Sequence, residues 1–567
     1  MRHPATVVTA LAGALHLLWF FAFANSGGDL AAQDAWAEFV GRHPDSAYNM
    51  AWYGGMHPVS YSVVSPYLMH LLGVRTTMML SGTLSAGLLT LVLCHARTGP
   101  APRPAPHGRT GHRHVWPAAL AGVFGLFCNA VSGRVTFGLG VLFALAAVAA
   151  VFCVPRRWRH RRGARAACVV PLAALATMAS PVAGLFLGLI AVALFVQRRR
   201  PGAWALGLGP SLVVAVSAWM FPFSGTQPVG LGTIALPVAM AVLVYAVTPP
   251  DWTTVRATCA VYGVAVVLVW AISSQIGSNI TRLAMLFAGV ALLAVLPFTE
   301  PRSRRWYTAL LSFALFAGWV GVSTVGDVVS MKPDAIWARD VAPLIDRLRR
   351  SGTGADQGRV EVVPASSHAE SSALVPYVNL ARGWNRQADR ERNPLFYDGT
   401  LNAVTYRQWL SRWAVHQVVL PLHGRPDGDG GRQERELIEG GLPYLEEVWS
   451  DDNWRLYAVT DPTPLADPPA EVVRADEEEL TVRVPRPGRY TVRVAHSPWL
   501  GLFDAAGELV PPPEPDGRNL RGCLTPGAED AWGVAWTVLD APAPGTYHLA
   551  ARYRIPRGTP CPEPDPS

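Results

Sequence analysis

Long apolar runs alternate with short polar connections over the first 324 residues. Uncharged apolar runs of about 17 to 25 residues can cross the hydrocarbon core of a bilayer, and such runs recur from Ala5 to Thr324. The pattern predicts about eleven spans, and a Ser180-Pro181 break separates two of them,. The predicted spans are 5–24, 74–94, 115–131, 136–154, 167–179, 182–197, 203–220, 231–248, 257–273, 283–298 and 306–324.

The first apolar run could also be a signal peptide, because it ends in "AFANSGG", whose small residues resemble a cleavage site,. We expect a retained helix instead. The run is longer than a usual signal core, and a further hydrophobic segment follows it within the next fifty or so residues,.

The pattern changes after residue 325, where no further spanning run occurs. Helical and strand periods alternate as far as Val459 and predict a small α/β unit. Period-two strands between Gly and Pro turns then predict a β-sandwich of the jelly-roll kind. The predicted fold is an α-helical polytopic membrane domain followed by two extracytoplasmic domains. The three domains cover residues 1–325, 326–460 and 461–567.

Composition and charge support this division. Charged residues make up 16% of the chain and the mean hydropathy is +0.21, whereas about a quarter of a soluble protein is charged. Arginine gathers in alternate connections, and placing these inside the cell leaves seventeen arginines inside against Arg42, Arg75, Arg134 and Arg282 outside,. An odd number of spans then puts the N-terminus in the cytoplasm and the C-terminal half outside. The net charge of +7 reports this topology in the lipid bilayer and predicts no nucleic-acid partner,.

Cysteine usage agrees with an exported C-terminal half. Five cysteines lie in or beside apolar spans, where a thiol behaves as a small hydrophobe,. Cys523 and Cys561 alone lie in the predicted outer region. We expect them to form a disulfide that ties down the C-terminal tail, and two unpaired thiols are the alternative.

Polar residues that interrupt the apolar pattern fall on the predicted outer side. Ionisable groups at membrane depth usually face a cavity, pair with one another or mark a substrate path. The candidates are Asp29, Asp34, Glu38, His57, Asn129, Arg134, Ser180, Ser224, Gln227, Gln275, Asn279 and Arg282.

The acidic candidates have structural alternatives. Asp34 and Glu38 are four residues apart, which is also typical of the wet face of an interfacial helix. The opposite face of that helix would touch lipid through Leu30, Trp36, Phe39 and Val40. Asp29 precedes the same helix and could serve as its N-cap.

The basic candidates have alternatives as well. Arg134 and Arg282 could extend to lipid head groups. His57, in "WYGGMHPVSY", fits a structural hydrogen bond as well as it fits a ligand contact.

A carboxylate and two guanidiniums outside the membrane suit the transfer of a sugar from a lipid-linked phosphate donor. A carboxylate can remove the proton of an acceptor hydroxyl, and arginine pairs with phosphate. Nucleotide sugars are absent outside the cytoplasm, so the donor would be a polyprenyl phosphate. Motifs for a P-loop, a zincin or a serine hydrolase are absent from the sequence,.

Five stretches resemble a group of actinobacterial GT-C glycosyltransferases, the arabinofuranosyl- and mannosyltransferase-like integral membrane class. The resemblance implies a GT-C helical fold, a polyprenyl-phosphate-linked sugar as donor and a catalytic aspartate in the first outer loop, which maps to Asp29. That loop has no adjacent Asp-Asp or Glu-Asp pair, which many members carry, so the resemblance leaves metal dependence open. The stretches are "GGDLAAQ", "MHPVSYSVVSPYL", "VSGRVTFGLG", "ASPVAGLFL" and "GSNITRL".

The sequence therefore predicts an enzyme that glycosylates a cell-envelope glycan. Asp29 would be the base, Arg282, Arg134 and Asn279 would bind the donor phosphate, and further polar groups would line the substrate cavity. No cofactor is assigned, and a divalent cation stays an open alternative. A transporter or flippase, and an inactive structural envelope protein, are the rival classes. The expected cavity residues are Asp34, His57, Ser180 and Gln275.

Overall fold

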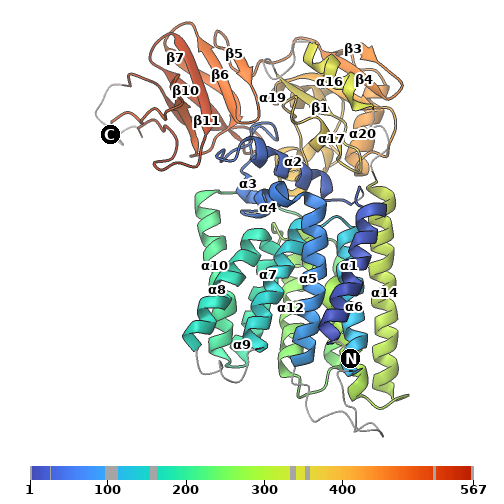
Figure 1. The fold of residues 1–567 in the computed structure, drawn as a ribbon. Helices are drawn as coiled ribbons and strands as arrows, with labels where there is room; N and C mark the ends of the chain where they lie inside the picture. Colours follow the sequence, from blue (N-terminus) through green and yellow to red (C-terminus); the bar gives the residue numbers. More distant parts are fainter. Residues whose placement is uncertain are drawn as a thin grey trace. The chain divides into compact units, whose positions relative to one another are not determined.

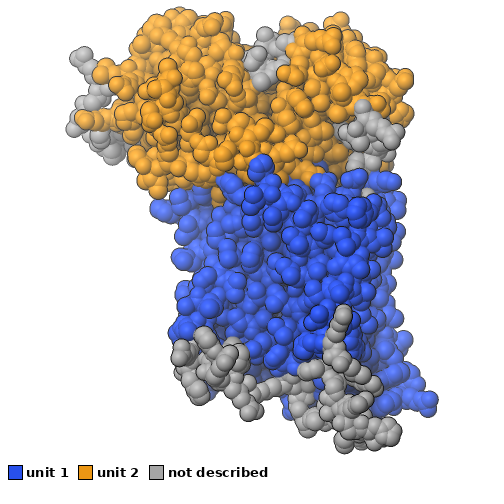
Figure 2. All heavy atoms as spheres, in the orientation of Figure 1, with its two compact units in different colours: residues 1–33, 61–332 blue, residues 34–60, 333–567 orange. Residues whose placement is uncertain are grey.

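The computed structural model describes residues 3–25, 27–95, 113–153, 162–332, 340–350, 358–514 and 519–562. The chain forms two compact units (Figure 2). Unit 1 comprises residues 1–33 and 61–332, and unit 2 comprises residues 34–60 and 333–567. Residues 34–60, predicted as an outer loop of the membrane domain, therefore belong to unit 2. Two of the arginine clusters predicted to be cytoplasmic, at 95–114 and 155–166, lie mostly outside the described residues.

Unit 1 is a helical bundle whose long helices run side by side (Figure 1). Among the described residues, seven helices are long and apolar enough to cross a membrane, and four shorter helices are apolar. Each predicted span coincides with one of these, which is compatible with a multi-pass membrane protein. The bundle contains α1 (Pro4–Ala22), α4 (Ser65–Leu72), α5 (Val74–His95), α6 (Trp116–Val131), α7 (Val135–Phe152), α8 (Arg162–Ala179), α9 (Pro181–Val196), α10 (Arg200–Met220), α11 (Leu231–Val247), α12 (Thr253–Ala271), η3 (Gly277–Thr281), α13 (Arg282–Val295) and α14 (Arg304–Ser330).

Local sequence explains the helix ends and the packing of unit 1. Helix α8 ends at Ala179 and α9 begins at Pro181, as the Ser180-Pro181 break predicted,. Small residues allow close helix approach: a Cβ on Gly82 of α5 would overlap the imidazole of His16. Large apolar side chains such as Trp219 and Val322 point outwards with about three quarters of their surface exposed (74% and 76%), which suits contact with lipid,.

The first part of unit 2 is a mixed sheet with the strand order β1-β2-β4-β3. Strands β1 and β2 are parallel, and the other neighbours are antiparallel. This arrangement, with helices between the strands, agrees with the predicted α/β character. The elements are α16 (Val341–Arg350), β1 (Arg359–Val362), α17 (Glu370–Ala373), α18 (Arg386–Arg392), α19 (Ala403–Arg412), β2 (Val415–Pro421), α20 (Gly428–Glu439), β3 (Leu445–Ser450) and β4 (Trp454–Val459).

The second part of unit 2 contains two β-sheets. Their orders are β7-β10-β9 and β5-β6-β11-β8. Period-two patterns predicted most of these strands. Strands β5 and β9 were missed because Val472-Val473 interrupts the alternation in β5 and Pro526-Gly527 lies inside β9. The strands are β5 (Glu471–Ala475), β6 (Glu479–Val484), β7 (Gly488–Ala495), β8 (Leu500–Phe503), β9 (Cys523–Glu529), β10 (Ala535–Ala541) and β11 (Gly545–Ala551).

Helix α2 (Leu30–Arg42) corrects the interfacial-helix interpretation. Trp36 and Phe39, expected to touch lipid, are fully buried, as are Leu30 and Val40 to within a few per cent. The Trp36 ring lies edge-on to Trp52, with centroids 5.1 Å apart. The apolar face of α2 therefore belongs to a protein core, because aromatic partners from the following loop cover it.

A buried charge cluster lies between the helices and the sheet of the α/β part. Arg382 donates two hydrogen bonds to Asp389, at 3.0 and 2.8 Å, and one to Glu434 at 3.2 Å. Glu361 on β1 lies 3.5 Å from the same guanidinium and is fully buried. Three carboxyl groups thus share one cation, which cannot neutralise them all if each is ionised.

Proton binding relieves this imbalance. Burial raises the pKa of Glu361 well above its usual value, and the neighbouring Glu434 adds to the increase,. Burial also raises the pKa of Glu434, against the attraction of Arg382. Burial alone would raise the pKa of Asp389, but Arg382 brings it below its usual value. The cluster therefore stays near neutrality by keeping protons on the glutamates.

We expect unit 2 of the Glu361→Gln variant to lose less stability at alkaline pH than unit 2 of the unmodified protein. A folded-state pKa above the unfolded value contributes stability below the unfolded pKa. That stability is lost as pH rises through the folded pKa, by about 1.4 kcal/mol for each pH unit that separates the two pKa values. The midpoint temperature of thermal unfolding of the full chain should fall less steeply between pH 6 and 9 for the variant than for the unmodified protein. Exposed Glu436→Gln is the matched control, and equal slopes would contradict the assignment.

Candidate functional site

Two glycine loops cross at one end of the helical bundle and carry the first candidate residues. Gly27 has φ +135° and Gly133 has φ +70°, values that L side chains rarely adopt,. A Cβ on Gly27 would lie 2.7 Å from the Cα of Gly133. Only glycine permits this approach, which brings Asp29 and Arg134 into neighbouring loops.

Gln33 holds the same two loops together. Its side chain is fully buried in the first turn of α2. The amide nitrogen donates to the carbonyls of Asp29 at 3.0 Å and Gly133 at 2.8 Å. The amide oxygen accepts from the backbone N–H groups of Val135 at 2.9 Å and Thr136 at 3.2 Å. Gln33 therefore fixes the backbone on which Asp29 and Arg134 sit.

Two ion pairs occupy this end of the bundle. Arg282, the first residue of α13, donates to Asp29 across 3.0 Å. Arg134, immediately before α7, donates to Asp327 of α14 across 3.2 Å. The partners are 253 residues apart in the first pair and 193 in the second. The structure thus brings together Asp29, Arg134 and Arg282, and adds Asp327, which sequence analysis missed.

Arg134 and Arg282 both line one small cavity of about 10 Å³. This space holds about one water molecule. Arg282 also lies over the Phe137 ring, 5.4 Å from its centroid, and Arg134 contacts the sulfur of Met285 at 4.0 Å. The arrangement can bind an oxyanion through two cations and can accept a proton on a neighbouring carboxylate. The cavity is lined by Gly125, Cys128, Asn129, Arg134, Phe137, Arg282, Met285, Leu286, Val320 and Thr324.

Three other predicted residues of unit 1 do not line this cavity. Asn279 lies in η3, one turn before Arg282, and its backbone carbonyl accepts the N–H of Arg282. Ser180 precedes α9 and packs against Gly140 of α7. Gln275 is exposed and donates to the carbonyl of Phe223 at 2.6 Å. Their polar character and their positions at the ends of apolar runs do not bring their side chains into this cavity.

The remaining two predicted residues belong to unit 2. His57 is buried, with one ring nitrogen 2.7 Å from the carbonyl of Ala47 and the other 3.0 Å from the hydroxyl of Ser497. Burial lowers its pKa to about 4, so the ring is neutral at physiological pH,. These two hydrogen bonds give His57 a structural role in unit 2. Asp34 is partly buried on α2, in the part of that helix assigned to unit 2.

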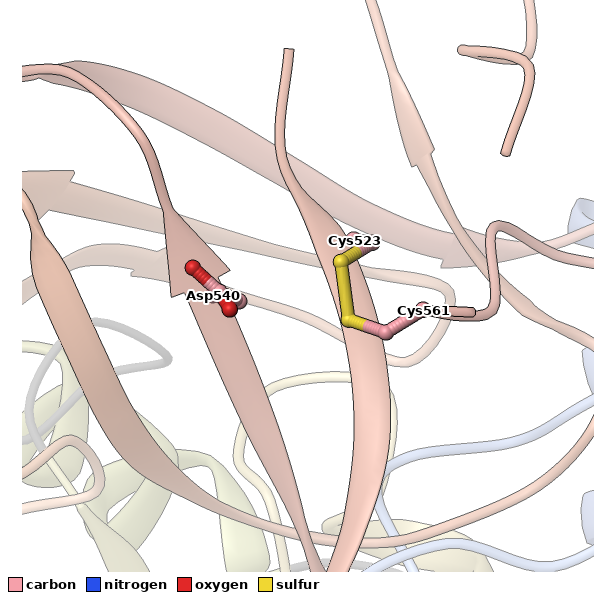
Figure 3. Close-up of side chains that lie close together, drawn as sticks. All are labelled: Cys523, Asp540 and Cys561. Atoms are coloured by element: carbon pink, nitrogen blue, oxygen red, sulfur yellow. A yellow bond between two sulfur atoms is a disulfide. The ribbon is translucent and has the colours of Figure 1, made fainter. Parts of the chain in front are cut away.

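The predicted disulfide between Cys523 and Cys561 is confirmed (Figure 3). It joins the start of β9 to the C-terminal tail. Asp540 of β10 lies beside it, and these three residues are the one group with metal-ligand spacing within the described ranges. Because both sulfurs are joined to each other, this group offers no thiolate for a metal ion.

The two residues that sequence analysis missed had detectable signals. Gln33 ends the stretch "GGDLAAQ", and a buried glutamine there could have been suspected from its apolar flanks. Asp327 is a lone acid in the apolar run that ends in "VGDVV", where an ionisable group usually has a partner,. Gln33 contacts Gly133 and Val135, 100 and 102 residues away, and Asp327 contacts Arg134, 193 residues away, so sequence could not identify these contacts.

We expect Gln33→Leu to destabilise unit 1 by about 2 kcal/mol. Leucine removes the acceptor of the Thr136 N–H and leaves the Val135 N–H only its bond to the carbonyl of Gly133 at 3.1 Å. Hydrogen exchange should accelerate at these two amides, and the thermal midpoint should fall. Gln275→Leu, at an exposed side chain, is the control. Unchanged exchange at residues 135 and 136 would contradict the role of Gln33.

The C-terminal part of the chain resembles a described protein family. A family model described as "Domain of unknown function (DUF8823)" matches residues 467–566, the part of unit 2 that contains the two β-sheets. No curated protein sequence matches the chain. The molecule is thus a multi-helix protein with several membrane-length apolar helices and a C-terminal β-sheet region that this family model matches.

Proposed function

We propose that this chain is a membrane glycosyltransferase of the GT-C kind. It would move a sugar from a polyprenyl-phosphate donor to a cell-envelope glycan at the outer face of the cytoplasmic membrane. The observation that carries the proposal is the convergence of Asp29, Arg134 and Arg282, two cations on one cavity with a carboxylate 3.0 Å from one of them. A polyprenyl tail would lie among the apolar helices.

The proposed reaction uses these groups in one displacement. Asp29 accepts the proton of the acceptor hydroxyl, and the acceptor oxygen forms a bond to the anomeric carbon of the sugar. The bond from that carbon to the phosphate oxygen breaks, and its electron pair remains on the phosphate. Arg134 and Arg282 stabilise the negative charge of the departing polyprenyl phosphate.

An outer location of unit 2 completes the proposal. The arginine distribution favours a cytoplasmic N-terminus and an extracytoplasmic C-terminal half. The Cys523–Cys561 disulfide supports an oxidising compartment, because such bonds persist outside the cytoplasm,. The two β-sheets, proposed to form a jelly-roll-like sandwich, and the α/β part would bind the glycan acceptor.

A transfer assay tests the proposal. The full chain is reconstituted in lipid nanodiscs with polyprenyl-phosphate-linked pentoses and hexoses and with envelope glycan fragments. Elongated glycan is the expected product. Failure to elongate any acceptor with any donor, by protein that is folded by thermal unfolding, would overturn the proposal.

A further inference from the structure

Arg134 and Arg282, the two cations of the candidate site, are each already paired with a carboxylate of the same chain. Arg282 is paired with Asp29 and Arg134 with Asp327, at 3.0 and 3.2 Å. The cavity that Arg134 and Arg282 help to line has about 10 Å³, the space of about one water molecule,. A phosphate group is larger than that. The site as observed must therefore open before a phosphate can reach both arginines.

The carboxylates are the partners that can leave. The side chains of Asp29 and Asp327 are 32% and 27% exposed, whereas those of Arg282 and Arg134 are 16% and 19% exposed. An aspartate that turns away can be hydrated, because its oxygens already meet solvent.

The guanidiniums have contacts that would keep them in place after the aspartates leave. Arg282 remains over the Phe137 ring through a cation–π contact,. Arg134 remains against Met285. The cationic site therefore persists without its internal carboxylates.

We propose that the donor phosphate opens the site by exchanging both ion pairs. The phosphate oxygens replace Asp29 on Arg282 and Asp327 on Arg134. This inference rests on the proposed function and adds its order of events. Asp29 is released to accept a proton only when the donor is in place, so the donor binds before the acceptor is activated. Asp327 is a positioning residue that holds Arg134 until the donor arrives.

Competition between an internal carboxylate and a ligand phosphate has a measurable consequence. Only molecules in which the ion pairs are open can bind phosphate. The apparent dissociation constant is therefore the intrinsic constant divided by the fraction of open molecules. Removing the charge of either aspartate removes that competition. Couplings of this kind typically change affinity by about 5- to 150-fold. A base without a latching role would leave the affinity for phosphate unchanged when replaced by asparagine.

The test measures binding of polyprenyl monophosphate, without sugar, to the full chain in nanodiscs. Asp29→Asn and Asp327→Asn should each bind about 5-fold or more tightly than the unmodified protein. Asp327→Glu restores the charge and should return the affinity towards that of the unmodified protein. Arg282→Gln should lose binding. Asp251→Asn, in the exposed connection between α11 and α12, is the matched control and should bind as the unmodified protein does.

The outcomes separate the two proposals. Equal or weaker binding by Asp29→Asn, with binding by the unmodified protein that depends on Arg282, overturns the exchange and leaves the proposed function standing. Absence of binding by all variants overturns the donor assignment and the exchange together. If Asp327→Asn does not fold, the binding measured for Asp29→Asn still tests the exchange. Tighter binding by that variant cannot arise from a damaged site.

Discussion

Asp29→Asn is expected to reduce sugar transfer by about 10²- to 10⁴-fold, the usual contribution of a general base. Asparagine has nearly the same shape as aspartate and cannot accept the acceptor proton. The fold should persist, because Asp29 is partly exposed and the Gln33 hydrogen bonds to its loop involve backbone atoms of that loop. Initial transfer rates of the variant and the unmodified protein in nanodiscs provide the measurement.

The control for this experiment is Asp45→Asn, sixteen residues later in the sequence, whose side chain is 60% exposed and 3.8 Å from Arg552. It should transfer sugar at the rate of the unmodified protein. If Asp29 only fixed helix packing through Arg282, its asparagine variant would lose thermal stability and keep its turnover per folded molecule. Retained turnover would therefore exclude Asp29 as the base.

Arg382→Met is expected to destabilise the α/β part of unit 2 by about 3–5 kcal/mol, the usual cost of leaving a buried charge without its partner. Methionine fills part of the space beside Phe396 but leaves Asp389, Glu361 and Glu434 without a cation. Hydrogen exchange should accelerate throughout α18 and α20. Because these helices carry Asp389 and Glu434, they report directly on the loss.

Two comparisons make this prediction specific. Arg350→Met removes a cation from an exposed pair with Asp346 and should change stability by no more than about 0.5 kcal/mol,. Adding Asp389→Asn to Arg382→Met should recover part of the loss, because Arg382 keeps the pKa of Asp389 below its usual value and asparagine removes this uncompensated charge. A double variant as unstable as the single one would show that electrostatic imbalance is not the cause.

The candidate site was only partly predictable. Asp29, Arg134 and Arg282 stood out because charged residues are rare beside long apolar runs, and that rarity is local information. Asn279, Ser180 and Gln275 stood out as uncharged polar residues beside apolar runs, yet their side chains do not line the cavity. His57 pairs with Ser497, more than four hundred residues later, which no local pattern indicates. Polar character selected candidates, and only the folded chain sorted them.

Sequence by itself determined where the apolar helices lie, where α8 and α9 separate, which half carries strands and which two cysteines pair. These features follow from periodicity, proline geometry and composition, which act over a few neighbouring residues. Tertiary structure decided that the apolar face of α2 lies in a core, that Gln33 joins two glycine loops, and that Asp327 completes the set of charges. Those outcomes depend on partners far apart in the chain, and contacts of that kind form only when the whole fold brings the segments together.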